Sequence, residues 1–304
     1  MARTQAALQP GRYIDPHVLA RIGNLQIVAR SVVDGFINGL HRAPYLGLSM
    51  DFAEHRQYMP GDDIRRIDWR LFARTDRYHV KQYEADTNAN FMVLLDVSKS
   101  MGYGSGSVTK LDYARFLTAS LAYFSSLQRD RVGMITFADD VLEYVPASAK
   151  HLDTLLHTVA VTQPRGASAL GAVFHKVQDL LRRRGVLVVV SDLYDEPEAI
   201  ARALAPLSLR GHDVIVFHVL DPAEHDLPFD DAASIEDMES GDRLPVVPAA
   251  LREKYVELIR GHIDGLNRQL TDQRIDYVPL DTSEPLDRAL FEYLSARERR
   301  SRTR

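Results

Sequence analysis

The stretch FMVLLDVSKSM, residues 91–101, decides the fold. An apolar run leads directly into Asp96, and two hydroxyl side chains, Ser98 and Ser100, follow at alternate positions. A short continuous apolar run is typical of a strand buried on both faces of a parallel sheet. We therefore expect Asp96, Ser98 and Ser100 at the carboxyl end of a buried strand, which is where open α/β sheets bind their ligands.

The sequence after residue 91 alternates apolar strand-like runs with helical segments, which predicts a parallel sheet covered on both faces. VLEYV is short and alternating, so we expect an edge strand there, and a hairpin around Ser240-Gly241-Asp242. The predicted strands are FMVLLD, RVGMITFA, VLEYV, VLVVVSD, DVIVFHVL and RIDYVPL, and the predicted helices span 110–127, 149–160, 169–183, 196–209, 249–272 and 285–299.

The predicted fold class is α/β: a doubly wound, mostly parallel sheet in three layers, with an α+β extension before it. We divide the chain into an N-terminal extension (1–90), the α/β domain (91–299) and a basic tail (300–304).

The extension itself is harder to interpret. A helix should begin at Asp15-Pro16, an N-cap acid followed by a first-turn proline, and its apolar spacing continues to Leu25. Glycines interrupt residues 31–58, which favours short extended pieces over a long helix. A further helix is expected after MPGDD, and HVKQYE is expected to form an antiparallel arm with FMVLLD.

Composition excludes several kinds of site. The 304 residues are 45% hydrophobic and 26% charged, with a formal net charge of -5, so we expect no nucleic-acid partner. The absence of cysteine excludes disulfides, thiolate nucleophiles and cysteine zinc sites. The N-terminus does not read as a secretory signal, and no apolar run approaches the roughly 18 residues of a membrane span. These features predict a cytoplasmic protein.

Polar residues gather where the predicted strands end. Beside Asp96, Ser98 and Ser100 we expect Asp192, from VLVVVSD, and Ser168, from the loop before residue 169. Carboxylate and hydroxyl oxygens suit a hard divalent cation, Mg²⁺ first, with Mn²⁺ or Ca²⁺ as alternatives. The alternative interpretation is that these side chains only cap the next helix and satisfy loop amides.

DVSKS resembles the DxSxS signature of the von Willebrand factor A fold, whose metal-ion-dependent adhesion site (MIDAS) binds a divalent cation. The resemblance implies Asp96, Ser98 and Ser100 as ligands from the first motif and Asp192 as the acid of a later loop. Ser168 stands where that family usually has threonine, and Arg165-Gly166-Ala167 replaces its paired glycines. Ser168 is therefore the ligand that departs from the pattern.

A second resemblance covers roughly residues 30–295. EHRQYMPGDDIRRIDWRLFAR, VKQYE, DVSKSM, SDLYD and LDTSEPLDRALFEYL are similar to the bacterial domain of unknown function 58 (DUF58) family. That family is associated with MoxR-type AAA+ ATPases. The resemblance implies a metal-binding adaptor or chaperone partner of such an ATPase, with an Asp or Glu of the partner completing the metal shell.

The first of these motifs mixes both charge signs with aromatic side chains. It suits an ion-pair network that locks the extension to the core, which we favour, or a recognition surface. The residues concerned are Glu54, Arg56, Tyr58, Asp62, Asp63, Arg66, Asp68 and Trp69.

We expect no enzymatic activity, no catalytic residue and no organic cofactor. One alternative is a metal-dependent hydrolase or phosphotransferase with Asp96 as nucleophile, as in the haloacid dehalogenase fold, but Ser98 stands where that fold needs a second acid. No histidine or lysine is placed by a motif to act as general acid. The other alternative is a structural scaffold whose metal site is vestigial.

Overall fold

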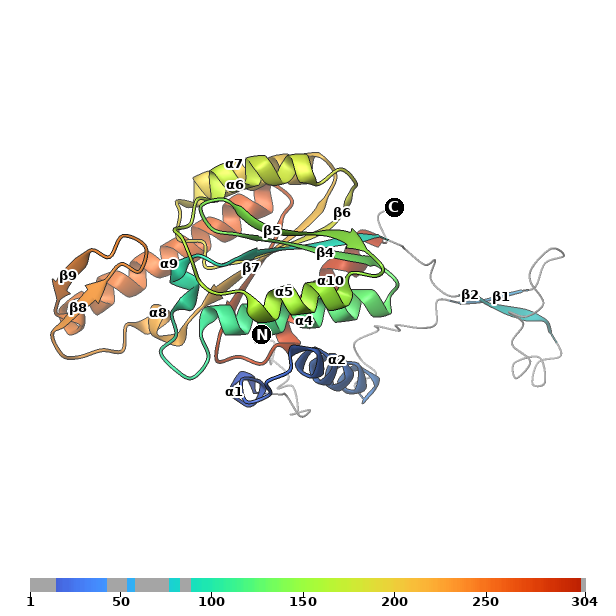
Figure 1. Ribbon diagram of the computed structural model, residues 1–304, viewed down its shortest axis with the longest axis horizontal. Helices are drawn as coiled ribbons and strands as arrows, with labels where there is room; N and C mark the ends of the chain where they lie inside the picture. Colours follow the sequence, from blue (N-terminus) through green and yellow to red (C-terminus); the bar gives the residue numbers. More distant parts are fainter. Residues whose placement is uncertain (1–14, 43–53, 58–76, 83–88, 302–304) are drawn as a thin grey trace, which may run out of the picture.

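A six-stranded sheet lies between two layers of helices (Figure 1). The computed structural model describes residues 15–42, 54–57, 77–82 and 89–301. Neighbouring strands are parallel except β4 and β5, which are antiparallel. The strands in spatial order are β10 (Asp276–Asp281), β7 (Asp213–Leu220), β6 (Gly185–Ser191), β3 (Asn90–Asp96), β4 (Arg131–Phe137) and β5 (Val141–Ser148). The predicted fold class is confirmed.

Strand β3 is apolar from Phe91 to Leu95 because both of its faces are covered. Phe91, Val93 and Leu95 belong to one hydrophobic core, and Met92 and Leu94 belong to the core on the opposite face. Successive side chains of a strand point to opposite faces, so a strand between two helical layers needs apolar residues at every position.

Two sets of helices build these layers, and Figure 1 shows α6 and α7 on one side of the sheet and α4 and α5 on the other. The first core contains residues of α2 (Leu25–Arg42), α4 (Lys110–Leu127), α5 (Leu152–Val161) and α10 (Asp287–Ser301). The second contains residues of α6 (Leu170–Leu180), α7 (Pro197–Leu209) and α9 (Pro248–Asp272). All six helices predicted after residue 109 are present, with small shifts at their ends.

The remaining elements are short. The expected edge strand is β5, and the expected hairpin is formed by β8 and β9. The short elements are α1 (Pro16–Leu19), β1 (Glu54–Gln57), β2 (His79–Gln82), the 3-10 helix η3 (Lys99–Gly102), α8 (Pro222–Asp226), β8 (Ala233–Glu236) and β9 (Arg243–Val246).

The prediction that HVKQYE and FMVLLD pair as an antiparallel arm is wrong. Strand β2 pairs with β1 instead, with Glu54 opposite Gln82. Strand β3 is paired in parallel with β4 on one edge and with β6 on the other, so it has no free edge to offer.

The prediction of short extended pieces from residue 31 is also wrong over residues 31–42. Helix α2 continues through Gly35 and Gly39 to Arg42. Val28, Val32 and Phe36 recur at helical spacing and are buried in the core that also contains α4. Burying three such side chains outweighs the roughly 1 kcal/mol that each glycine costs in a helix.

The helix expected at Asp15-Pro16 does begin there, and the Asp15 carboxylate accepts a hydrogen bond of 2.8 Å from the backbone of His17. It ends at Leu19, however, rather than continuing to Leu25. The helix expected after residues 59–63 lies outside the described residues, and the proposed domain boundaries stay a prediction.

The order of the strands reverses at β3. The chain runs from β3 to β4 on one side and later enters β6 on the other side. Asp96 is the last residue of β3 and Ser191 the last residue of β6. In open α/β sheets, ligands bind at such a switch point, beyond the carboxyl ends of the strands.

None of the helices in the described ranges combines the length and the apolar character needed to cross a membrane.

Replacing Phe36 with alanine tests whether α2 belongs to the domain core. Phe36 is 7% exposed, and its ring packs edge-on against Phe124 of α4, with centroids 6.5 Å apart. Because the substitution leaves a cavity, we expect the free energy of unfolding, measured with urea, to fall by about 3–5 kcal/mol.

Ile27→Ala is the matched control, because Ile27 lies on the same helix and is 53% exposed. It should change the free energy of unfolding by no more than about 0.5 kcal/mol. Equally small effects of both substitutions would contradict the packing of α2 on α4.

Candidate functional site

The turn after β3 brings its polar side chains to one point. Asp96 and Ser98 are fully buried, and the Asp96 Oδ1 atom accepts a hydrogen bond of 2.8 Å from the Ser98 backbone N–H. The hydroxyl oxygens of Ser98 and Ser100 lie 3.0 Å apart. Val97 is buried in the core and Lys99 is exposed, as the alternation of the motif predicts.

The separation of the two hydroxyl oxygens suits an octahedral cation. Ligands in adjacent positions around Mg²⁺, with bonds of roughly 2.0–2.1 Å, are about 2.9 Å apart. Ser98 and Ser100 already have this spacing, at 3.0 Å, so both could bind one ion without rearrangement of the turn.

The end of β6 adds a second acid to the first. The Ser191 hydroxyl donates to the Asp96 Oδ2 atom at 2.6 Å, and Asp192, the next residue, is 1% exposed. Burial, together with the charge of Asp192, raises the pKa of Asp96 to about 7, although hydrogen bonds from Ser191 and Ser98 oppose the shift. Two such carboxylates are stabilised by any cation between them.

Lys110 supplies one positive charge to this group. Its ammonium is fully buried and lies 2.8 Å from Oδ2 of Asp192 and 2.8 Å from Oε1 of Glu224. Burial alone would lower the pKa of Lys110, but the two carboxylates raise it above its ordinary value. Asp192 and Glu224 therefore share one ammonium while Asp96 adds a third carboxyl group, and a dication would offset the remaining negative charge. The charges of the site thus fit a divalent metal ion.

Ser168 belongs to a loop that lies directly against the DVSKS turn. The Arg165 N–H donates to the Val97 carbonyl at 2.7 Å, and the Lys99 N–H donates to the Gly166 carbonyl at 3.1 Å. Gly166 has φ 72°, where another residue would be strained, and a Cβ there would lie 2.9 Å from the Asp139 carboxylate, so glycine is favoured. These bonds hold the loop that leads into Ser168 against the first motif.

Glu239, at the tip of the β8–β9 hairpin, links Ser168 to the rest of the site. Its Oε1 atom accepts a hydrogen bond of 3.1 Å from the Ser168 backbone, and the Ser100 hydroxyl is a second partner. Burial raises the pKa of Glu239, and the nearby charge of Asp192 raises it further. The structure thus brings Asp96, Ser98, Ser100 and Asp192 together, with Ser168 joined to them through Glu239.

Two histidines hold the loop that carries Asp192. The Asp192 carbonyl can only accept, so His218 Nε2 donates to it at 2.8 Å, and His218 Nδ1 accepts from the Tyr277 hydroxyl at 2.6 Å. Burial lowers the pKa of His218 to about 3, which keeps the ring neutral. His262 Nε2 donates to the carbonyl of Leu193, a residue in the left-handed region at φ 48°. Both carbonyls of this strained turn are therefore fixed.

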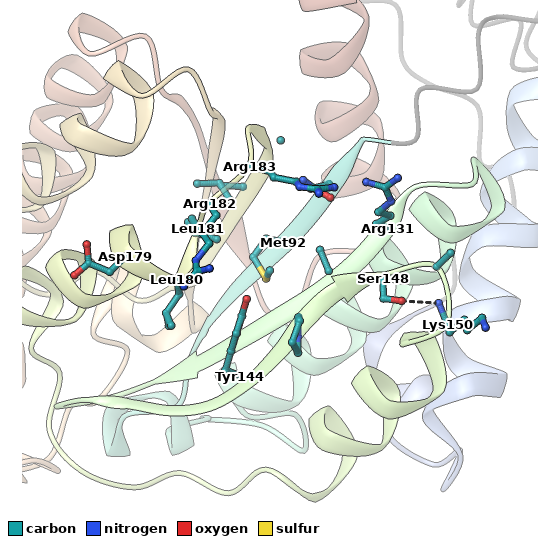
Figure 2. A pocket seen from close by; sticks show the side chains of 16 residues that line it. Met92, Arg131, Tyr144, Ser148, Lys150, Asp179, Leu180, Leu181, Arg182 and Arg183 are labelled. Carbon is teal, nitrogen blue, oxygen red and sulfur yellow. Dashed lines mark hydrogen bonds between the residues drawn. The ribbon is translucent and has the colours of Figure 1, made fainter.

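A cavity of about 680 Å³ lies at the other end of the sheet (Figure 2). It is lined by Asn90 and Gly185, the first residues of β3 and β6, and by apolar side chains such as Met92. Arg131 and Arg183 lie on its rim. The cavity is thus separate from the polar cluster at the carboxyl ends of the strands.

Sequence reasoning missed Lys110 and Glu239. Lys110 could have been noticed, because it directly follows the N-cap Thr109, where the helix dipole disfavours a cation. Glu239 gives no such signal, since an acid at a hairpin tip is ordinary.

A metal ion here would depend on serine hydroxyls. Across residues 15–42, 54–57, 77–82 and 89–301, no group of three or more His, Cys, Asp or Glu side chains could hold a metal ion by itself. Of the charged motif singled out in the extension, Glu54 and Arg56 fall in β1. The others, Tyr58, Asp62, Asp63, Arg66, Asp68 and Trp69, lie outside the described residues.

Comparisons with known proteins identify relatives along most of the chain. The uncharacterized protein Rv1480 of Mycobacterium tuberculosis is 29% identical over 292 residues, which are 94% of this chain and 91% of Rv1480. Mb1516 of Mycobacterium bovis is similar to the same extent.

Solved structures give weaker similarity. BatB from Bacteroides thetaiotaomicron is 19% identical, with a TM-score of 0.49 over 69% of this chain and 99% of BatB. The SpRpn10 VWA domain is 14% identical, with a TM-score of 0.41 over 66% of this chain and 92% of that domain. The sequence model of "Protein of unknown function DUF58" matches residues 54–264, more than half of the chain. This chain therefore belongs to the DUF58 family.

Proposed function

We propose that this protein is a metal-dependent protein-interaction module. Ser98, Ser100 and Ser168, with Asp96 and Asp192, would hold one divalent cation, Mg²⁺ first and otherwise Mn²⁺ or Ca²⁺. The cation would bind a carboxylate of a partner protein. The observation that supports this most is the pair of hydroxyl oxygens 3.0 Å apart beside two buried acids at the switch point of the sheet.

The side chains of the site are better arranged to hold a metal ion than to catalyse a reaction. Asp96 is fully buried and both of its carboxylate oxygens accept hydrogen bonds, from Ser98 and Ser191, so it is poorly placed to attack a substrate. The Lys110 ammonium is held by two carboxylates, and the buried His218 ring is neutral. Neither is free to exchange protons with a substrate. Binding therefore explains the site better than hydrolysis or phosphoryl transfer.

The proposed partner is a MoxR-type AAA+ ATPase, on the strength of the family resemblance, and the proposed location is the cytoplasm. Exposed apolar side chains near the site support a protein partner. Ile235 and Leu244 face each other across the hairpin and are 46% and 65% exposed, and Met238 at the tip is 40% exposed. Exposed apolar patches beside a polar site mark protein contacts.

A scaffold without metal is the second candidate, and one contact favours it. Lys110 already binds Oδ2 of Asp192, so an ammonium could serve in place of the ion. One charge, however, is shared between Asp192 and Glu224 and leaves Asp96 without a cation partner among the described residues. Metal binding distinguishes the two candidates.

Asp96→Ala tests the metal site. We expect the wild type to bind one Mg²⁺ or Mn²⁺ in calorimetry, and the variant to bind at least about 100-fold more weakly, because a charged member of the site is lost. Asp140→Asn is the control, since Asp140 follows the neighbouring strand β4 but is exposed and paired with Lys176. A folded wild type that binds neither ion would favour the scaffold.

Affinity capture from the native host tests the partner. Tagged wild-type protein should retain a MoxR-type ATPase in Mg²⁺ and lose most of it in chelator, because the bridging ion is removed. Asp96→Ala should lose the ATPase even in Mg²⁺, whereas Asp140→Asn should retain it. Capture that is equal in all four samples would exclude a metal-bridged contact.

A further inference from the structure

We infer that Glu239 is an internal ligand of the proposed metal site, held where the carboxylate of a partner would otherwise bind. The β8–β9 hairpin would then keep the module occupied by its own chain until a partner displaces it. This inference rests on the proposed function and adds a regulatory state to it.

The position of Glu239 is the first argument. It is half-buried, whereas the residues around it from 234 to 242 are exposed. Its carboxylate accepts from the Ser168 backbone at 3.1 Å, has the Ser100 hydroxyl as a partner and experiences the charge of Asp192. The charge of Asp192 disfavours the ionised form of Glu239, and a cation between the two carboxylates would stabilise both.

The hairpin tip is built to hold Glu239 in this direction. The Asp237 side chain accepts hydrogen bonds from the Glu239 N–H at 2.8 Å and from the Ser240 hydroxyl at 3.0 Å. Gly241, at φ 79°, donates to the Asp237 carbonyl at 2.7 Å and closes the turn. The turn is therefore ordered by its own bonds, and Glu239 is presented to the site by a preorganised loop.

The hairpin can also leave the site at low cost. Strands β8 and β9 pair only with each other, and their described side chains are exposed apart from the half-buried Val246. Figure 1 shows the hairpin at one end of the molecule, next to α8 and α9. An element with few buried side chains opens with little loss of free energy. A partner that binds the exposed apolar face of the hairpin could thus free the metal and offer its own acid.

The test uses Mn²⁺ alone, with the full-length protein. Glu239→Gln keeps the shape and the acceptor oxygen but removes the charge, and a water should replace the lost ligand on the ion. We expect Mn²⁺ affinity to fall by about tenfold and the water-proton relaxivity of bound Mn²⁺ to rise. Acetate should lower that relaxivity in the variant and have little effect in the wild type.

Glu236→Gln is the matched control, because Glu236 lies in the same hairpin but is exposed and paired with Arg243. It should leave affinity and relaxivity unchanged. If wild type and Glu239→Gln both bind Mn²⁺ with the same affinity and relaxivity, Glu239 is not a ligand and the inference fails alone. If the wild type binds no Mn²⁺, the proposed function fails, and this inference fails with it.

Discussion

Two buried carboxylates at the ends of adjacent strands are the constraint on which the site depends. Asp96 ends β3 and Asp192 follows β6, and the register of a parallel pair leaves both acids at the same edge of the sheet. Asp96 is fixed by the pairing of β3, and the Asp192 backbone is held by His218. Their mutual repulsion and their burial must therefore be offset by neighbours, and the surrounding residues can be understood by how they do this.

Hydrogen bonds and one ammonium offset these charges. Hydrogen bonds from Ser191 and the Ser98 backbone stabilise Asp96, and the Lys110 ammonium stabilises Asp192. Neutral His218 fixes the Asp192 carbonyl without adding charge. The Ser98 and Ser100 hydroxyls, 3.0 Å apart, would suit a hard cation. The same charge balance gives Glu239 its proposed role, because a cation in the site would stabilise an added carboxylate.

Much of the fold could be predicted because a strand that is buried on both faces appears in the sequence as a continuous apolar run. FMVLL and VLVVV are apolar at every position, and the polar residues that follow them predicted where Asp96, Ser98, Ser100 and Asp192 meet. The helix over Gly35 and Gly39 was missed because its burial against α4 is a tertiary effect that local propensity does not contain. The pairing of β2 with β1 was missed because strand partners depend on which edges are free.

The roles of Lys110 and Glu239 were missed for a related reason. Lys110 reaches Asp192 across 82 residues and Glu239 reaches Ser168 across 71, and no local pattern records such distances. The most direct test of the account is anomalous scattering from a crystal soaked in Mn²⁺. The account predicts one anomalous peak within bonding distance of the Ser98 and Ser100 hydroxyls and next to Asp96 and Asp192. No peak there, or a peak only elsewhere, would contradict it.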